Sequence, residues 1–84
     1  MDEIEKELQE KGYLRVVRHV EPQSDCSRHY YEMARQMSII YITKGPVGNG
    51  RLHEIVFYFQ NPNLILDFGE RVEAAQWEEK RKFK

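Results

Sequence analysis

The side chains best suited to metal binding or nucleophilic chemistry are three histidines and a single cysteine: His19, Cys26, His29 and His53. Two residues separate Cys26 from His29, but a structural zinc site usually draws four ligands from two close pairs and includes at least two cysteines. A Cys26 nucleophile with His29 as its base would need a third group to orient the histidine, and the sequence suggests none. We therefore expect a loop cysteine, hydrogen-bonded or solvated histidines, and neither a metal nor a cofactor.

The adjacent residues His53 and Glu54 are the best candidates for acid–base catalysis. A small nuclease could use such a pair together with an arginine that stabilises the anionic transition state. Consecutive residues of a strand point to opposite faces, however, so both can serve one site only if a bulge intervenes. Nuclease activity is therefore the third choice, and we expect a protein that is not an enzyme.

Arginines, histidines and tyrosines are interleaved in the segments that we expect to be strands. A sheet face of this composition could stack single-stranded bases and neutralise phosphates, and tyrosine and arginine are also common anchors of protein interfaces. The alternative in which these residues have no binding role places the tyrosines at the core edge and the arginines in solvent. We rank it first for the individual residues, with protein contact next and nucleic acid after it. The candidate binding residues are Arg15, Arg18, Arg28, Tyr30, Tyr31, Arg35, Arg51 and Tyr58.

Composition limits the possible partners and location. The 84 residues suffice for one domain, 1–84, and the formal net charge of −1 provides no overall attraction to nucleic acid or to an anionic membrane. A single cysteine excludes an intramolecular disulfide, and the acidic start Met1-Asp2-Glu3 lacks the basic character of a secretory signal. No apolar stretch is long enough to span a membrane. These features predict a cytoplasmic, intracellular protein.

Two elements are expected before residue 21. Residues 2–11 predict a helix, with Asp2 as N-cap, Gly12 as C-terminal stop and only Ile4 and Leu8 as an apolar stripe. Residues 13–20 are rich in β-branched and aromatic types and predict a strand. So narrow a stripe favours a weakly held helix.

Residues 27–37 fit two periods. Tyr30, Met33, Ala34 and Met37 recur at helical spacing, with Ser24 or Asp25 as a possible cap, while the odd-numbered residues alternate as in a strand. The alternation continues into the strand expected at 38–43, so we favour one long strand over 28–44.

The clearest pattern is a hairpin. Gly45 to Gly50 concentrates turn residues between two strongly apolar segments, which predicts antiparallel strands at 38–44 and 51–60 in the centre of the sheet. Residues 64–68 fit either an edge strand or the first turn of a last helix, which we expect from Gly69 onward. The predicted fold is α+β: a small antiparallel sheet of three to four strands flanked by N-terminal and C-terminal helices.

Both faces of the predicted hairpin are apolar. Ile55, Phe57 and Phe59 alternate with Val56 and Tyr58, and the strand at 38–44 shows the same two-sided pattern. Two terminal helices with few apolar residues cannot easily cover both faces, so we expect an exposed apolar patch. Such patches commonly bind a second copy or another protein. The predicted function is therefore protein binding with self-association as a homodimer, nucleic-acid binding being the alternative.

Overall fold

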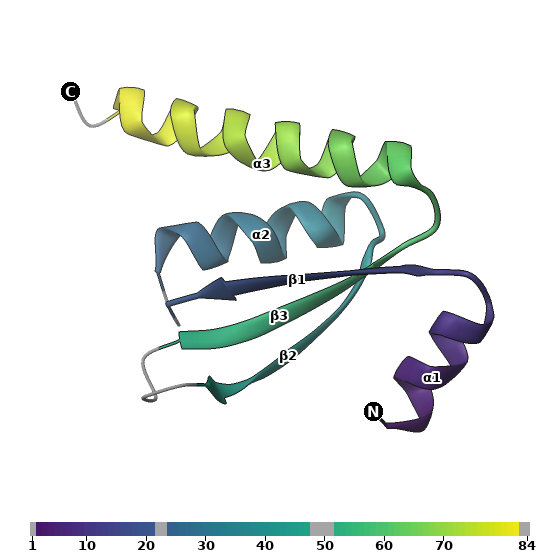
Figure 1. Ribbon diagram of the computed structural model, residues 1–84. Coiled ribbons are helices and arrows are strands. Elements are labelled where there is room, and N and C mark those ends of the chain that lie inside the picture. The colour runs from purple at the N-terminus through teal and green to yellow at the C-terminus, as the bar shows by residue number, and fades with distance from the viewer. Residues whose placement is uncertain (1, 22–23, 48–51, 83–84) are drawn as a thin grey trace.

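The computed structural model describes residues 2–21, 24–47 and 52–82. It is an α+β structure with an antiparallel sheet between N-terminal and C-terminal helices, as predicted (Figure 1). The elements in chain order are α1 (Glu3–Glu10), β1 (Leu14–Val20), α2 (Asp25–Gln36), β2 (Ile40–Val47), β3 (Leu52–Phe59) and α3 (Pro62–Lys82).

The sheet has the strand order β1-β3-β2. β1 pairs with β3 from Leu14 opposite Phe59 to Val20 opposite His53, and β2 pairs with β3 from Ile40 opposite Tyr58. The predicted hairpin is confirmed, but β3 alone is central and β2 forms an edge. Since β1 and β2 both run antiparallel to β3, they are parallel to each other with β3 between them, which is a split βαβ arrangement.

The N-terminal elements follow the expectation. Asp2 caps α1 by accepting a hydrogen bond of 2.9 Å from the Glu5 amide, which satisfies one otherwise unpaired donor. Gly12 ends the helical segment with φ of 92°, a backbone conformation that glycine adopts at little cost. The strand expected at 13–20 is β1.

The long strand expected over 28–44 is wrong, because residues 25–36 form the helix α2. Ser24 caps this helix by accepting a hydrogen bond of 3.1 Å from the Ser27 amide. The helical period determines which side is buried, since Ala34 packs into the core with Tyr30 beside it. The helix is followed by Ser38, whose φ of 56° turns the chain before β2 begins.

The last helix begins at Pro62 rather than Gly69, so residues 64–68 are helical. Pro62 occupies the start of the helix, where its missing amide donor costs nothing. The side chain of Asn61 accepts a hydrogen bond of 3.0 Å from the Leu64 amide and so caps the helix.

The hydrophobic core lies between the sheet and the two longer helices, which both cover the same face (Figure 1). Phe57 is at its centre, with ring centroids 4.9 Å from Phe68 and 5.8 Å from Tyr30. Ile55 and Phe59 flank Phe57 on the same side of β3 and are also buried. The short helix α1 lies on the other side of the sheet (Figure 1). Within the described residues, no helix has the length and apolar character to cross a membrane.

Candidate interaction surfaces

The eight candidate binding residues do not share one surface. Tyr30 packs in the core against Phe57 and Phe68, and Tyr58 is buried on the opposite face of the sheet. Arg18 is exposed on β1, whereas Arg28 to Arg35 lie on α2 and not on a strand. Arg51 lies outside the described residues. Those of the eight that the structure describes therefore do not form a flat base-stacking face on the sheet.

Three of the candidates, Arg28, Tyr31 and Arg35, do lie together on α2. They line a shallow hollow of about 440 Å³ with Ser24, Asp25 and Ser27. The Tyr31 ring lies 5.3 Å from that of Tyr41 on β2, and Arg35 donates a hydrogen bond of 3.3 Å to the Tyr41 hydroxyl. This group, which we call the α2 stripe (Arg28, Tyr31, Arg35 and Tyr41), joins two cations to two tyrosines whose rings are in tilted contact.

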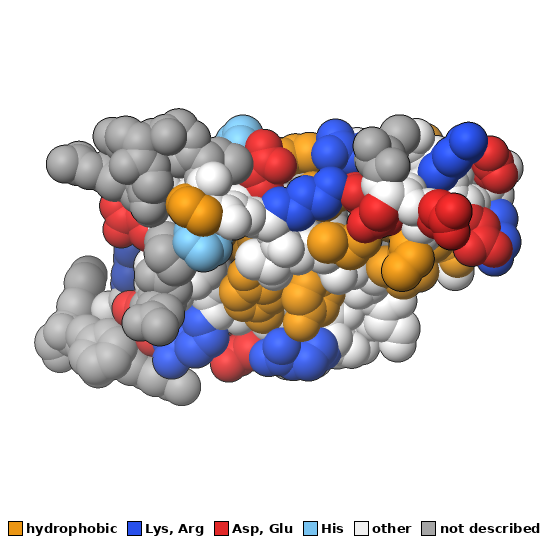
Figure 2. All heavy atoms as spheres, turned by 90° about the horizontal axis from the view of Figure 1, so that it is seen from below, with side chains coloured by type: hydrophobic (Ala, Val, Ile, Leu, Met, Phe, Trp, Pro, Cys, Tyr) orange, Lys and Arg blue, Asp and Glu red, His pale blue; other side chains and the backbone are white. Residues whose placement is uncertain are grey.

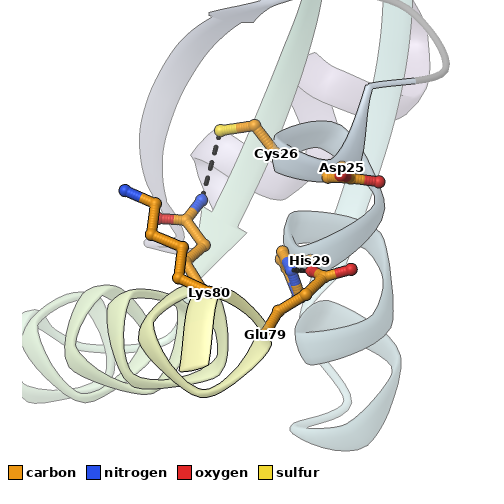
Figure 3. Close-up of a pocket in the computed structure, with 6 residues that line it drawn as sticks. Asp25, Cys26, His29, Glu79 and Lys80 are labelled. Carbon is orange, nitrogen blue, oxygen red and sulfur yellow. Dashed lines mark hydrogen bonds and ion pairs between the residues drawn. The ribbon is translucent and has the colours of Figure 1, made fainter. Parts of the chain in front are cut away.

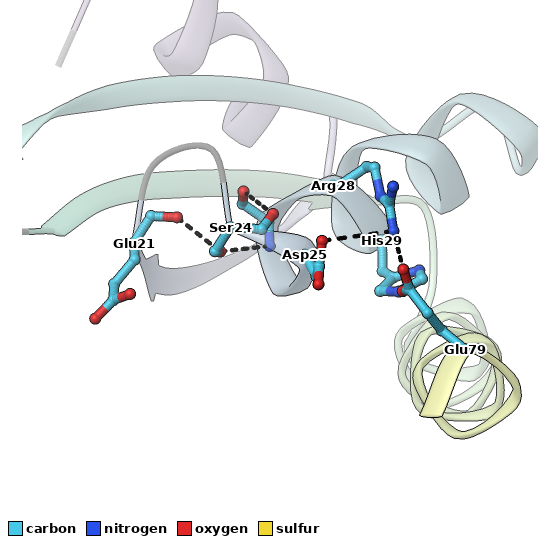
Figure 4. Close-up of polar contacts among 7 residues, drawn as sticks. Glu21, Ser24, Asp25, Arg28, His29 and Glu79 are labelled. Carbon is cyan, nitrogen blue, oxygen red and sulfur yellow. Dashed lines mark hydrogen bonds and ion pairs between the residues drawn. The ribbon is translucent and has the colours of Figure 1, made fainter. Parts of the chain in front are cut away.

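Arg28 is also part of a link between α2 and α3. Arg28 and His29 both donate hydrogen bonds to the carboxylate of Glu79, and Asp25 lies 3.6 Å from Arg28 (Figure 4). These two donors lower the pKa of Glu79 below its ordinary value, and the hydrogen bond with Glu79 raises the pKa of Arg28. The charge of Arg28 is therefore largely balanced within the protein, which leaves Arg35 as the more available cation of the α2 stripe.

A second hollow, of about 320 Å³, lies between the first turn of α2 and the last turns of α3. Its lining includes Cys26, His29 and Glu79, the residue types of a nucleophilic triad (Figure 3). The Cys26 thiol points away from His29, however, and accepts a hydrogen bond of 3.2 Å from Gln76 (Figure 3). Cys26 is exposed, and His29 serves as a donor to Glu79. The geometry lacks the contact between nucleophile and base that covalent catalysis requires.

The geometry of the described residues supports neither a metal site nor the arrangement of a nuclease site. Among residues 2–21, 24–47 and 52–82, no three His, Cys, Asp or Glu side chains are placed to hold a metal ion. Glu54 meets His19 of β1, with 3.0 Å between His19 Nε2 and Glu54 Oε1. His53 points to the other face, where its ring lies so close to Gly45 that a Cβ added there would come within 2.7 Å of it. His53 and Glu54 thus lie on opposite faces, as the strand pattern predicted.

A buried carboxylate forms the main polar cluster on the α1 side of the sheet. Glu5 has an exposed fraction of 0%, and it accepts hydrogen bonds from the Tyr58 hydroxyl and the Lys44 ammonium group. Arg15 Nε lies 3.9 Å from the same carboxylate. The hydrogen bond from Lys44, followed by that from Tyr58, lowers the pKa of Glu5, although burial opposes the shift. Burial and the hydrogen bond to Glu5 raise the pKa of Tyr58.

Sequence reasoning missed Glu5. It is one of five acidic residues in the first ten, and a glutamate in a polar helix is normally solvated. The available signal for its burial was its place next to Ile4, which belongs to the narrow apolar stripe of this helix. The identity of its partners depends on how α1 docks, which no local pattern encodes.

The same side of the sheet carries an incompletely covered apolar area. Val17, Val56 and Ile42 form one row across the three strands, because Val56 is directly opposite both of the others. Val56 is fully buried, Val17 and Ile42 are half-buried, and Ile40 is 40% exposed at the β2 edge. Ile4 on α1 is 64% exposed. We call this group, Ile4, Val17, Ile40, Ile42 and Val56, the lower patch.

The expectation of an uncovered apolar patch on the central hairpin, both of whose faces are apolar, is corrected in its position by the lower patch. Hydrophobic side chains gather in the middle of this side of the molecule, with charged groups of both signs around them (Figure 2). β3 itself is buried on both faces, from Ile55 to Phe59, so the protein's own helices shelter the central strand. The exposure lies on β2 and α1 instead, because among the described elements α2 and α3 cover one face and only the eight-residue α1 covers the other (Figure 1).

Comparison of the chain with protein-family models, with characterised proteins and with solved structures finds no match, so the geometry described above is the basis on which its function is inferred.

Proposed function

We propose that this protein is a non-enzymatic protein-binding module that self-associates through the lower patch. The observation that supports this proposal is the exposure of Ile40 beside a continuous apolar row of the sheet, together with that of Ile4 on α1, the helix on the same side. Covering such an area removes apolar surface from water, which contributes roughly 25 cal/mol for each Å² buried.

A second copy suits this surface because charged groups of both signs surround its apolar centre (Figure 2). α1 carries the exposed acids Glu3 and Glu7, of which Glu7 also pairs with Lys11, whereas Arg15 and Lys44, which contact Glu5 of their own chain, lie at the sheet on the same side of the molecule. In a twofold interface each surface meets its own copy, so α1 of one protomer can lie against the open part of the sheet of the other. Ile4 would then be covered by the partner.

The test is the molar mass in solution, measured by light scattering and by sedimentation over a range of protein concentrations. We expect a dimer that Ile40→Lys and Ile4→Lys each convert to monomer, because a buried lysine without a partner is costly. Leu66→Lys is the matched control, since Leu66 is 68% exposed on α3, far from the lower patch. Circular dichroism spectra verify that each variant folds. A wild-type monomer at every concentration would refute self-association.

The α2 stripe supports a second candidate, binding of single-stranded nucleic acid. Neighbouring tyrosine rings beside an arginine are suited to bases and phosphates, although Glu79 already balances Arg28. A fluorescence titration with oligonucleotides should then show affinity that falls steeply with salt and that Arg35→Ala reduces. Binding that salt leaves unchanged would reject this candidate.

We propose the cytoplasm as the location. The lone, exposed Cys26 supports it, because a reducing compartment keeps such a thiol free. Fractionation of the cells that make the protein, with antibody detection, is the direct test.

A further inference from the structure

The two edges of the sheet differ in how well they are protected against further pairing. The edge strand β2 has a register irregularity between Lys44 and Val47, and Pro46 within it has no amide to donate. Bulges and prolines are devices by which proteins block the pairing of an edge with another strand. β1, in contrast, pairs through seven consecutive residues without irregularity and contains neither proline nor glycine.

β1 is therefore an open edge. In the described part of the chain, β3 is its only neighbour in the sheet. Alternate residues of an antiparallel strand direct their amide and carbonyl groups away from the partner, so β1 presents such groups along its outer side. One carbonyl of this strand, that of Val17, accepts a hydrogen bond from the Arg18 side chain. Leu14, Arg15, Arg18 and His19 of this strand have exposed side chains.

A small hollow lies next to this edge, between β1 and α3. It has a volume of about 40 Å³, and Val16, Arg18, Ile65, Phe68 and Gly69 contribute to its lining. Val16 and Arg18 are on the helix-covered face of β1, since they are opposite Phe57 and Ile55. A strand added beside β1 would direct every second side chain toward this hollow.

We propose that the outer edge of β1 binds an extended segment of another protein by strand addition. The segment carries an apolar and an acidic side chain two positions apart. Backbone hydrogen bonds to β1 provide the affinity, and the side chains that alternate toward the hollow provide the selectivity. The apolar side chain lies against Val16 and Ile65, and the acidic one against Arg18.

The charges of β1 favour an acidic segment over a second copy of β1. Arg18 donates a hydrogen bond of 3.1 Å to the Val17 carbonyl, and it has no carboxylate partner within residues 2–21, 24–47 and 52–82. If β1 paired with itself in the register that matches all seven residues, centred on Val17, Arg15 would lie opposite His19. Such a pair has no charge complementarity, whereas an acid opposite Arg18 gains a charge-assisted hydrogen bond.

The probe is a capped seven-residue peptide, Thr-Thr-Glu-Thr-Val-Thr-Thr, titrated into ¹⁵N-labelled protein and followed by NMR. In an antiparallel alignment its glutamate lies opposite Arg18 when its valine lies opposite Val16. Two control peptides replace the glutamate by lysine, or keep the composition but place the glutamate directly next to the valine. We expect the probe to bind about tenfold more tightly than either control, since a hydrogen bond to a charged group is worth at least that factor. The amides of β1 should shift and gain protection from exchange.

Three variants sharpen the test. Arg18→Glu should weaken binding of the probe about tenfold and shift the preference to the lysine peptide. Arg81→Glu makes the same charge change at an exposed site on α3 and should change neither the affinity for the probe nor the preference between the peptides. Gly69→Ala should stabilise α3 by restricting the unfolded chain, because a Cβ there meets no atom within 4 Å. The same methyl group should nevertheless weaken binding of the probe several-fold, because it narrows the hollow.

Four results would overturn the proposal. The first two are equal affinity of the protein for the three peptides, and affinities in Arg18→Glu that equal those of the wild type. The other two are amide shifts confined to residues outside β1 and the adjacent part of α3, and an affinity of Gly69→Ala for the probe that equals that of the wild type. Protection of the β1 amides that rises with protein concentration alone would assign the edge to a second copy instead. Ile40 is on the far strand β2 and on the opposite face of the sheet from Val16 and Arg18, so Ile40→Lys, which tests self-association, should still bind the probe.

Discussion

The Tyr58 hydroxyl donates a hydrogen bond of 2.5 Å to the carboxylate of Glu5 and so joins the central strand to the first helix. Lys44 of the edge strand β2 donates to the other oxygen of the same carboxylate. The apolar contacts of α1 are few, since Ile4 is largely exposed and Leu8 only half-buried. Glu5 is therefore the principal attachment of α1 to the sheet.

Glu5→Gln should lower the free energy of unfolding by about 2 kcal/mol, because the buried amide neither balances Lys44 nor accepts as strongly from Tyr58. Urea unfolding followed by circular dichroism measures the change. Glu7→Gln is the matched control on the same helix, where an exposed pair with Lys11 at 3.5 Å predicts a loss below about 0.5 kcal/mol. Equal effects of the two substitutions would contradict the role of Glu5.

The stability should depend on pH through the same carboxylate. The pKa of Glu5 is lowered from its ordinary value of 4.5 in the folded protein, so the unfolded chain takes up this proton first as the pH falls. The stabilisation is then complete above pH 4.5 and is lost as the pH falls through the folded pKa. Unfolding curves between pH 3 and 7 should show a smaller decline for Glu5→Gln than for the wild type, and parallel curves would argue against the shift.

The ion pairs between α2 and α3 predict a titration that can be observed directly. The pKa of Glu79 lies below its ordinary value because Arg28 and His29 donate to it. Carbon-detected NMR of the Glu79 carboxyl should show this low pKa, and Arg28→Ala should move it back toward the ordinary value. An unchanged pKa in Arg28→Ala would show that the arginine is not the main cause.

Burial rather than size should determine the effect of substitutions in α3. Val72 is 3% exposed in the core, so Val72→Ala should cost about 2 kcal/mol through lost apolar burial and the remaining cavity. Trp77 is 58% exposed, and Trp77→Ala should change the stability by less than about 0.5 kcal/mol despite removing a larger side chain. Thermal unfolding at low protein concentration gives both values, and the reverse order would place α3 differently on the sheet.

The parts of the fold that short-range chemistry determines could be predicted from the sequence. Asp2 and Gly12 delimit α1, and the turn residues between 45 and 50 identify the hairpin. The start of α3 was not predicted, because Asn61 followed by Pro62 is typical both of a helix cap with its first helical residue and of a turn.

Other parts depend on contacts between distant residues. The segment around Met33 fits both a helical and a strand period, and only the packing of Ala34 against the sheet decides between them. The placement of two helices on one face leaves the lower patch on the other, which alternation within β3 cannot reveal. The burial of Glu5 likewise requires Lys44 and Tyr58, which are 39 and 53 positions away.

The strand order also bears on how the chain acquires its structure. β2 and β3 are neighbours in the sequence, whereas the residues of β1 are separated from their partners by 33 positions at Val20 and His53 and by 45 at Leu14 and Phe59. Closing a long loop costs more chain entropy than closing a short one, so the hairpin should assemble early and β1 should join it late. During synthesis on the ribosome, β1 is therefore the first of the three strands to emerge, and it stays unpaired until the rest of the sheet has been made.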